Sequence, residues 1–148
     1  MDTVTKEQRS RIMAQVKGSQ NKTTELVFVK LLAGESVHGW RRKYPLQGNP
    51  DFVFLKARLA VFIDGCFWHG CPRHCRMPDG NRAYWEQKIS RNVSRDKVVT
   101  RQLKQSGWSV IRFWEHEMKG GRAFTSKMNR LKRIVKQDKS SVRGKPRR

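Results

Sequence analysis

The segment PDFVFLKARLAVFIDGCFWH, residues 50–69, constrains the fold more than any other part of the chain. Residues 52–55 and 59–63 are short apolar runs joined by a polar turn at Lys56 and Ala57, a pattern that predicts two paired strands. The second run is apolar at every position, as in a strand that is buried on both faces. The chain is therefore expected to fold around a sheet that other elements cover on both sides.

The flanking segments indicate helices on both sides of these strands. Thr5 and Gln8 form a capping box that begins a helix running to about Gly18, and a second helix begins near Thr23. The sequence pattern predicts strands over 37–44, 52–55, 59–63 and 108–114, and helices over 5–18, 23–34, 81–106 and 124–135. The order α-β-β-β-α-β, followed by the last helix, predicts an α/β fold in which a mixed sheet is flanked by helices.

The length and the charge suggest one domain that binds a polyanion. The chain has 148 residues, enough for a single domain over residues 1–135, and the basic tail over 136–148 is expected to be disordered. The formal net charge is +21, and residues 101–148 hold 15 Lys or Arg against three acids. This surplus favours a nucleic-acid backbone as the partner, with the N-terminal helix over 1–20 lying on DNA. A solvated basic surface, a membrane-surface patch and a passive ribosomal-type binder are the alternatives.

Nothing in the sequence directs the chain to a membrane or out of the cell. No apolar run approaches the roughly 20 residues of a membrane span, and the first ten residues lack the apolar stretch of a signal peptide. The three cysteines are an odd number within a short segment, which makes a poor disulfide framework and suits a reducing compartment. We therefore expect a cytoplasmic protein.

The cysteine segment has the spacing of a metal site. Cys66, Cys71, His74 and Cys75 follow one another closely, and tetrahedral Zn²⁺ takes four ligands from Cys and His. His116 is a natural distant ligand that would hold this loop to the sheet. The spacing leaves open whether His74 or Cys75 completes the set, and buried but inert cysteines are the alternative.

Two carboxylates and an imidazole mark a second candidate site. Asp51 begins the first apolar strand, Asp64 ends the next, and His69 follows in the turn. Hard oxygen ligands suit Mg²⁺, and a histidine suits general-base catalysis of phosphodiester hydrolysis. Asp96 interrupts the helical stripe Trp85, Ile89, Asn92, Asp96, Val99 and Leu103, so it is expected to accept from His69. The alternatives are a turn aspartate at position 51, a zinc-ligating His69, and an Asp96 paired with one of the neighbouring residues Arg91, Arg95 and Lys97.

Aromatic side chains accompany these polar groups. Phe67 and Trp68 lie in the same loop, and Trp85 lies early in the long helix. Exposed rings beside a basic surface insert between base steps or stack on bases, so we expect these three rings to be exposed to DNA. Packing around the cysteine loop is the alternative.

Several segments together resemble the very short patch repair (Vsr) family of DNA mismatch endonucleases over roughly residues 5 to 135. These segments are NPDFVF, VFIDGCFWHGCPRH, NRAYWEQKISRNVSRD and GWSVIRFWEHE, together with the early helix that carries Glu25. The resemblance implies a restriction-endonuclease-like core of the PD-(D/E)xK superfamily. It also implies a nuclease that nicks 5′ to the T of a T:G mismatch arising from deamination of 5-methylcytosine.

The resemblance also implies roles for individual residues. Asp51 would bind Mg²⁺ together with the backbone carbonyl of Ile63. His69 would be the general base, oriented by Asp96. The surrounding water and phosphate network would include Glu25 and Asp64. Structural zinc would be held by Cys66, Cys71, His74 and His116, with Cys75 as an alternate. The residues assigned to DNA binding are Phe67, Trp68, Trp85 and Lys88.

The implied partner is double-stranded DNA with a T:G mismatch. Mismatch-repair accessory proteins and a functional link to a DNA cytosine methyltransferase are also expected, for a monomer associated with the bacterial nucleoid. The chain lacks the usual (D/E)xK lysine, because Asp64 is followed by Gly65 and Cys66. Two other functions stay open: a zinc-stabilised nucleic-acid-binding protein without catalysis, and a Vsr-like homing or restriction-type nuclease that cuts matched DNA.

Overall fold

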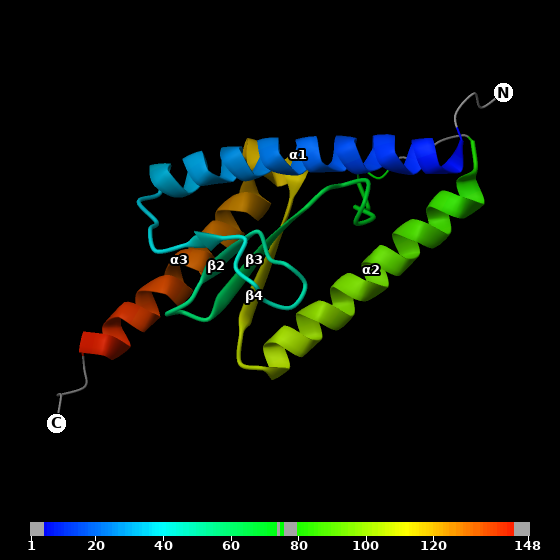
Figure 1. Cartoon of the computed structure of the whole chain (residues 1–148). Coiled ribbons are helices and arrows are strands. Elements are labelled where there is room, and N and C mark those ends of the chain that lie inside the picture. The colour runs from blue at the N-terminus through cyan, green and yellow to red at the C-terminus, as the bar shows by residue number, and fades with distance from the viewer. Residues whose placement is uncertain (1–4, 74, 76–79, 144–148) are drawn as a thin grey trace.

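The computed structural model describes residues 5–73, 75 and 80–143 and contains a four-stranded sheet with helices on both faces (Figure 1). The elements are α1 (Lys6–Gly34), β1 (Arg41–Arg42), β2 (Phe52–Phe54), β3 (Leu59–Asp64), α2 (Arg82–Gln105), β4 (Ser109–Trp114), the 3₁₀ helix η1 (Glu115–Lys119) and α3 (Arg122–Arg143). The order α-β-β-β-α-β with a final helix is confirmed. Among the described residues, no helix is both long and apolar enough to span a membrane.

The sheet is mixed, as predicted. The strand order is β1-β2-β3-β4, with the first two pairings antiparallel and the β3–β4 pairing parallel. In the parallel pair Asp64 lies opposite Trp114, so β3 and β4 end at the same edge of the sheet. The segments that follow these ends, residues 65–71 and η1, therefore leave the sheet side by side.

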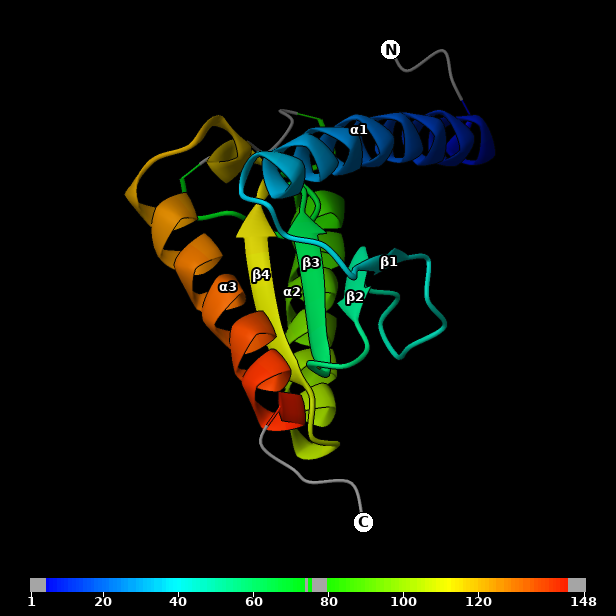
Figure 2. The same cartoon turned by 90° about the vertical axis from the view of Figure 1, so that its left-hand side faces the viewer.

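The two faces of the sheet have different neighbours, because successive side chains of a strand point to opposite sides. Leu59, Val61 and Ile63 pack with Phe28 of α1 and Met128 of α3 in the larger apolar core. The alternate residues of β3 and β4 form a smaller core with Leu103 and Val99 of α2, namely Ala60, Phe62 and Val110. Figure 2 shows α3 in front of the sheet and α2 behind it, with α1 crossing above the ends of the strands. The prediction that the second apolar strand is buried on both faces is confirmed.

Two predictions of where elements begin and end are wrong, each for a local reason. The helices expected over 5–18 and 23–34 are one continuous helix, because Gly18 alone does not end a helix and residues 19–23 contain no proline. Thr5 and Gln8 do form the predicted capping box. The strand expected over 37–44 is reduced to Arg41–Arg42, because Gly39 and Lys43 on either side adopt positive φ angles of 89° and 53°.

The tail differs from the prediction as well. Helix α3 continues to Arg143, so residues 136–143 are helical where a disordered chain was expected. No Gly or Pro occurs between positions 136 and 143, and the basic and polar residues there are compatible with a helix. The boundary at residue 135 is therefore not a change of secondary structure.

The loop before β2 generates a stability prediction. Gly48 has a φ of 81°, and a Cβ atom there would lie 2.3 Å from Cγ1 of Val99 on α2. Gly39 also has a positive φ, 89°, but its Cβ would meet nothing within 4 Å. Both alanine substitutions strain the backbone, and only the first also overpacks the loop against the helix. We therefore expect Gly48→Ala to lower the free energy of unfolding by about 1–3 kcal/mol more than Gly39→Ala.

Urea unfolding of the two variants measures this difference. The added substitution Val99→Ala should restore part of the loss in Gly48→Ala, because it removes the methyl group that causes the clash. Equal destabilisation by the two glycine substitutions would show that the loop does not pack on α2 as described.

Candidate active site

A buried ion pair lies where β3 and β4 end. Asp64 and Arg112 both point to the α2 face of the sheet, and Nη1 of Arg112 donates to the two carboxylate oxygens of Asp64 at 3.0 and 3.1 Å. Burial raises the pKa of Asp64, and the charges of His69 and Arg112 oppose that rise. The pKa stays raised on balance, so His69 and Arg112 offset only part of the cost of burying this carboxylate.

His69 lies beside this pair, in the segment that follows β3. Its Nδ1 atom is 2.5 Å from Oδ2 of Asp96 and 3.7 Å from Oδ1 of Asp64, so only Asp96 is within hydrogen-bond distance. The backbone N–H of His69 donates to the carbonyl of Gly65. The side chain of Asn92 donates to the carbonyl of Trp68, the residue before His69. With Nδ1 engaged, Nε2 is the ring nitrogen that is left to accept a proton.

The partner of Asp96 is thus His69, as predicted, and the alternative pairing with Arg91, Arg95 or Lys97 is not observed. A second contact comes from Arg112, whose Nη1 lies 3.8 Å from Oδ1 of Asp96. The ligand atoms of Asp64, His69 and Asp96 all lie within 4.8 Å of one another. These three residues line a cavity of about 590 Å³ between α2 and the sheet.

Arg112 is the residue of this site that the sequence analysis missed. Its Nε donates to Oγ1 of Thr100, and its Nη2 donates to the backbone carbonyl of Asp96, so it joins the sheet to α2. Its guanidinium also lies over the ring of Phe62, 4.1 Å from the centroid. The available signal was a single cation inside the apolar strand SVIRFW, at a position that faces α2 by the alternation of the strand.

Asp51 and Glu25 form a second acidic group. The Asp51 carboxylate accepts a hydrogen bond of 2.7 Å from the backbone N–H of Ile63. Its pKa is raised to about 7, first by burial and then by a hydrogen bond and charge repulsion from Glu25, with a smaller contribution from Asp64. Arg42 pairs with Glu25. The two acids line a cavity of about 380 Å³, so the structure divides the predicted catalytic residues between two neighbouring hollows.

The sulfur ligands form a third group. Nδ1 of His116, which η1 brings to the loop, is 3.2 Å from Sγ of Cys66 and 3.6 Å from Sγ of Cys71. Burial raises the pKa of the Cys66 thiol to about 11. The Cys75 thiol instead donates to the carbonyl of Phe67 and does not belong to this cluster of ligand atoms. The predicted ligand His74 lies outside the described residues.

The expectation of exposed aromatic rings is wrong for two of the three. Trp68 and Trp85 are buried, with exposed fractions of 7% and 5%, and Phe67 is half-buried. The rings pack edge to face with centroid distances of 5.1 to 6.1 Å. Lys88 lies over the rings of both tryptophans. These rings therefore pack around the cysteine loop, which was the alternative to exposure on the DNA-binding surface.

The edge of the mixed sheet brings together carboxylates and an imidazole, which are groups that can bind a metal ion or transfer a proton in a hydrolase. Comparison with known proteins defines the family. The family described as DNA mismatch endonuclease Vsr matches residues 1–77, just over half of the chain. The chain therefore belongs to the Vsr family and is a DNA endonuclease.

Individual relatives agree with this assignment. The chain is 40% identical over 120 residues, 80% of each protein, to a Type II nicking enzyme, V.NmeDIP, of Neisseria meningitidis serogroup C. It is 31% identical over 127 residues to the DNA mismatch endonuclease Vsr of Escherichia coli K12, which covers 84% of this chain and 78% of that protein. A third match, 56% identical to the nicking enzyme V.NaeI of Lentzea aerocolonigenes, spans 69 residues, 47% of this chain and 42% of that protein.

The acidic group around Asp51 generates a pH prediction. Because its folded pKa of about 7 exceeds the ordinary value of 3.8, the folded protein retains a proton that the unfolded chain releases. The free energy of unfolding therefore falls as the pH rises from about 4 to 7, because folding opposes the ionisation of Asp51. In magnesium-free buffer without chelator, we expect Asp51→Asn to be more stable than the wild type at pH 8, by on the order of 2 kcal/mol, with no difference near pH 4.

Denaturant unfolding across this pH range measures the effect. Glu86→Gln, which removes an exposed carboxylate far from the site, should leave the pH dependence unchanged. Added Mg²⁺ should narrow the difference by stabilising the wild type. If Asp51→Asn follows the wild-type curve at every pH, burial of this carboxylate carries no cost.

Proposed function

We propose that this endonuclease nicks DNA 5′ to the T of a T:G mismatch, in a reaction that depends on Mg²⁺. The observation that carries the proposal is the His69–Asp96 pair beside the buried Asp64. The similarity to the mismatch endonuclease of Escherichia coli supports the mismatch as the substrate. Deamination of 5-methylcytosine is the reaction that produces such a mismatch, which connects the proposal to a DNA cytosine methyltransferase.

His69 is the proposed general base. Asp96 accepts from Nδ1 and so holds the ring orientation and the tautomer in which Nε2 is unprotonated. Nε2 then takes a proton from the attacking water at the scissile phosphate. Asp64 is engaged by Arg112, so it does not compete for Nδ1 and instead contributes to the polar surroundings of the phosphate.

The oxygen donors fit a hard divalent cation. Asp51 and Glu25 are close enough to repel each other, and the raised pKa of Asp51 records a buried charge that lacks a sufficient counter-charge. Mg²⁺, when bound, would stabilise negative charge on the scissile phosphate. We propose Asp51 and the carbonyl of Ile63 as its protein ligands, with Glu25 in the surrounding water network.

The sulfur cluster fits zinc. Two thiols and one imidazole converge, and Zn²⁺ in structural sites takes a fourth ligand from Cys or His. We propose Cys66, Cys71, His116 and His74 as that set. A bound zinc ion would fix the loop that carries His69, since His69 lies between two of the ligands in the sequence.

The aromatic cluster is the proposed contact to the mismatch. Phe67, the half-buried ring, is able to meet DNA with the least rearrangement. Trp68 and Trp85 would reach the bases only if the cluster opens. Lys88 would follow the DNA backbone beside them. Accessory repair proteins, a monomeric state and a place in the cytoplasm at the nucleoid stay expectations.

A nicking assay tests the substrate. We expect the thymine strand of a T:G duplex to be cut at least about 100-fold faster than the same duplex with T:A, because opening the step beside a wobble pair costs a few kcal/mol less. We expect His69→Ala to lower the rate by about 100-fold or more with duplex affinity unchanged. His38→Ala, which removes an exposed histidine outside the site, is the matched control.

The alternatives correspond to distinct results of that assay. Equal cutting of matched and mismatched duplexes would identify a homing or restriction-type nuclease. Binding without any cutting in Mg²⁺ would identify a non-catalytic DNA-binding protein. A His69→Ala variant that cuts as fast as His38→Ala would remove the general base from the proposal.

The zinc assignment has its own test. We expect Cys66→Ser to lose zinc and to melt at a lower temperature, because bound structural zinc contributes folding free energy. Cys75→Ser should retain both zinc and stability, since that thiol bonds to a backbone carbonyl. Elemental analysis and thermal unfolding of the two purified variants measure this. Full zinc content in His74→Ala would exclude that histidine as the fourth ligand.

A further inference from the structure

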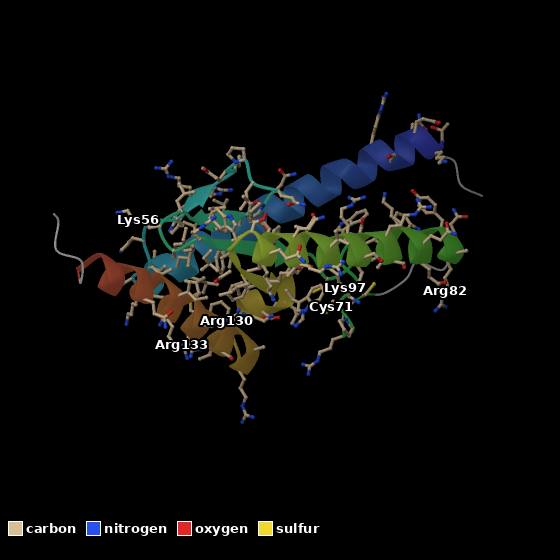
Figure 3. The ribbon with its side chains drawn as sticks, turned by 90° about the horizontal axis from the view of Figure 1, so that it is seen from below. Lys56, Cys71, Arg82, Lys97, Arg130 and Arg133 are labelled. Atoms are coloured by element: carbon tan, nitrogen blue, oxygen red, sulfur yellow. The ribbon has the colours of Figure 1, made fainter. Side chains whose placement is uncertain are left out.

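The cavity that contains His69 has a basic wall that the proposed chemistry does not use. Lys97, Arg101 and Lys104 line it from α2, all three exposed. Their spacing of four and three residues places them on one face of the helix. Figure 3 shows Lys97 on α2 in the same part of the molecule as Cys71 of the ligand loop. One end of the cavity is therefore acidic and the adjoining wall is basic.

These three cations have no acidic partner among the described residues. On other elements of the structure, several cations pair with acids: Arg42 with Glu25, Lys127 with Glu117, and Lys132 with Glu35. Three adjacent unpaired cations repel one another, and a polyanion relieves that repulsion. The arrangement therefore favours an external anion as the partner.

The charge balance of the cavity is positive without any metal. Its charged lining residues are Asp64, Asp96, Lys97, Arg101, Lys104 and Arg112, four cations against two carboxylates, with His69 in addition. An acidic nuclease centre would repel a phosphate backbone unless a cation reversed its sign. Here the side chains of α2 and β4 already provide that reversal.

We propose that Lys97, Arg101 and Lys104 form a phosphate-binding ridge that holds the DNA strand beside His69 before and independently of Mg²⁺. The first and last cations of the ridge are seven residue steps apart, about 10 Å at the rise of an α-helix. One strand of B-DNA carries a phosphate about every 3.4 Å along its axis, so the ridge faces about three successive phosphates. The inference rests on the proposed function only in taking DNA as the ligand.

The position of the ridge follows from α2. Asp96, which orients His69, and Lys97 are consecutive residues of that helix, so the strand is held at a fixed distance from the general base. DNA affinity and cutting should therefore separate: the ridge supplies affinity, and the acidic end with its cation supplies chemistry.

The test compares two triple variants of equal charge. The ridge variant is Lys97→Gln with Arg101→Gln and Lys104→Gln. The control is Arg130→Gln with Arg133→Gln and Lys136→Gln, three exposed cations of α3 on the other face of the sheet; Figure 3 labels the first two on that helix. The probe is a fluorescent matched duplex, which stays intact under the proposed specificity, and binding is measured by anisotropy in magnesium-free buffer.

We expect the wild type to bind this duplex in magnesium-free buffer within about threefold of its affinity with Mg²⁺. We expect the ridge variant to bind at least about tenfold more weakly than the wild type, with the slope of log affinity against log salt shallower by about 2 to 3. The α3 control should lose markedly less duplex affinity than the ridge variant. Equal losses in the two variants, or wild-type binding that requires Mg²⁺, would overturn the proposal.

Thermal unfolding checks that both variants are folded. If the ridge variant is unfolded, the single substitutions are compared: Arg101→Gln should weaken duplex binding more than Arg133→Gln. Equal affinities of these two single variants would also overturn the proposal. A duplex that binds through the ridge but is never nicked at T:G would contradict the proposed function and leave this inference intact. If the wild type nicks at T:G and the ridge variant binds the duplex as tightly as the wild type, the proposed function stands and this inference is wrong.

Discussion

The ion pair between Arg112 and Asp64 is the interaction on which the geometry of the site depends. A guanidinium carries N–H groups on three nitrogens, and the contacts to Asp64, Thr100 and the Asp96 carbonyl use all three nitrogens. These contacts connect β3, β4 and α2 at one point. Removing one partner of such a pair leaves a buried charge uncompensated, at a cost of about 3–5 kcal/mol. It would also release α2, which carries the carboxylate that orients His69.

The sheet separates stability from chemistry. The face toward α1 and α3 is covered by large apolar side chains, with Phe28, Phe52 and Phe113 fully buried. The face toward α2 has the smaller core of Ala60, Phe62 and Val110, and Asp64 and Arg112 follow these residues on the same face. Because the larger core does not include these polar residues, it stabilises strands that also hold repelling carboxylates at one edge.

How far the sequence predicted the site follows from the kind of signal that each residue gave. The His69–Asp96 contact was predictable, because an acid in a largely apolar helical stripe needs a partner. The convergence of Cys66, Cys71 and His116 was predictable from ligand chemistry. Arg112 was not singled out, since one cation in a strand is ambiguous until the register shows Asp64 on the same face of the neighbouring strand.

The errors arose where tertiary packing overrides local pattern. The sequence predicts exposed rings at Trp68 and Trp85 because the loop offers no obvious core and the surrounding surface is basic, yet the two rings bury each other together with Phe67. The sequence predicts a helix end at Gly18, but a single glycine costs only about 1 kcal/mol within a long helix. Short strand β1 ends at Arg42, because the next residue, Lys43, has a positive φ that no propensity argument anticipates for a lysine.

Helix α2 combines three functions because the period of an α-helix gives it separate faces. One stripe, with Ile89 and Leu103, is buried. At the edge of that stripe Asp96 meets His69, and the adjoining face carries the three cations of the phosphate-binding ridge. A rigid helix fixes the spacing between these faces, whereas a loop would leave it free to vary. The distance between the proposed general base and the bound strand is therefore set by helix geometry, and Arg112 fixes where that helix lies on the sheet.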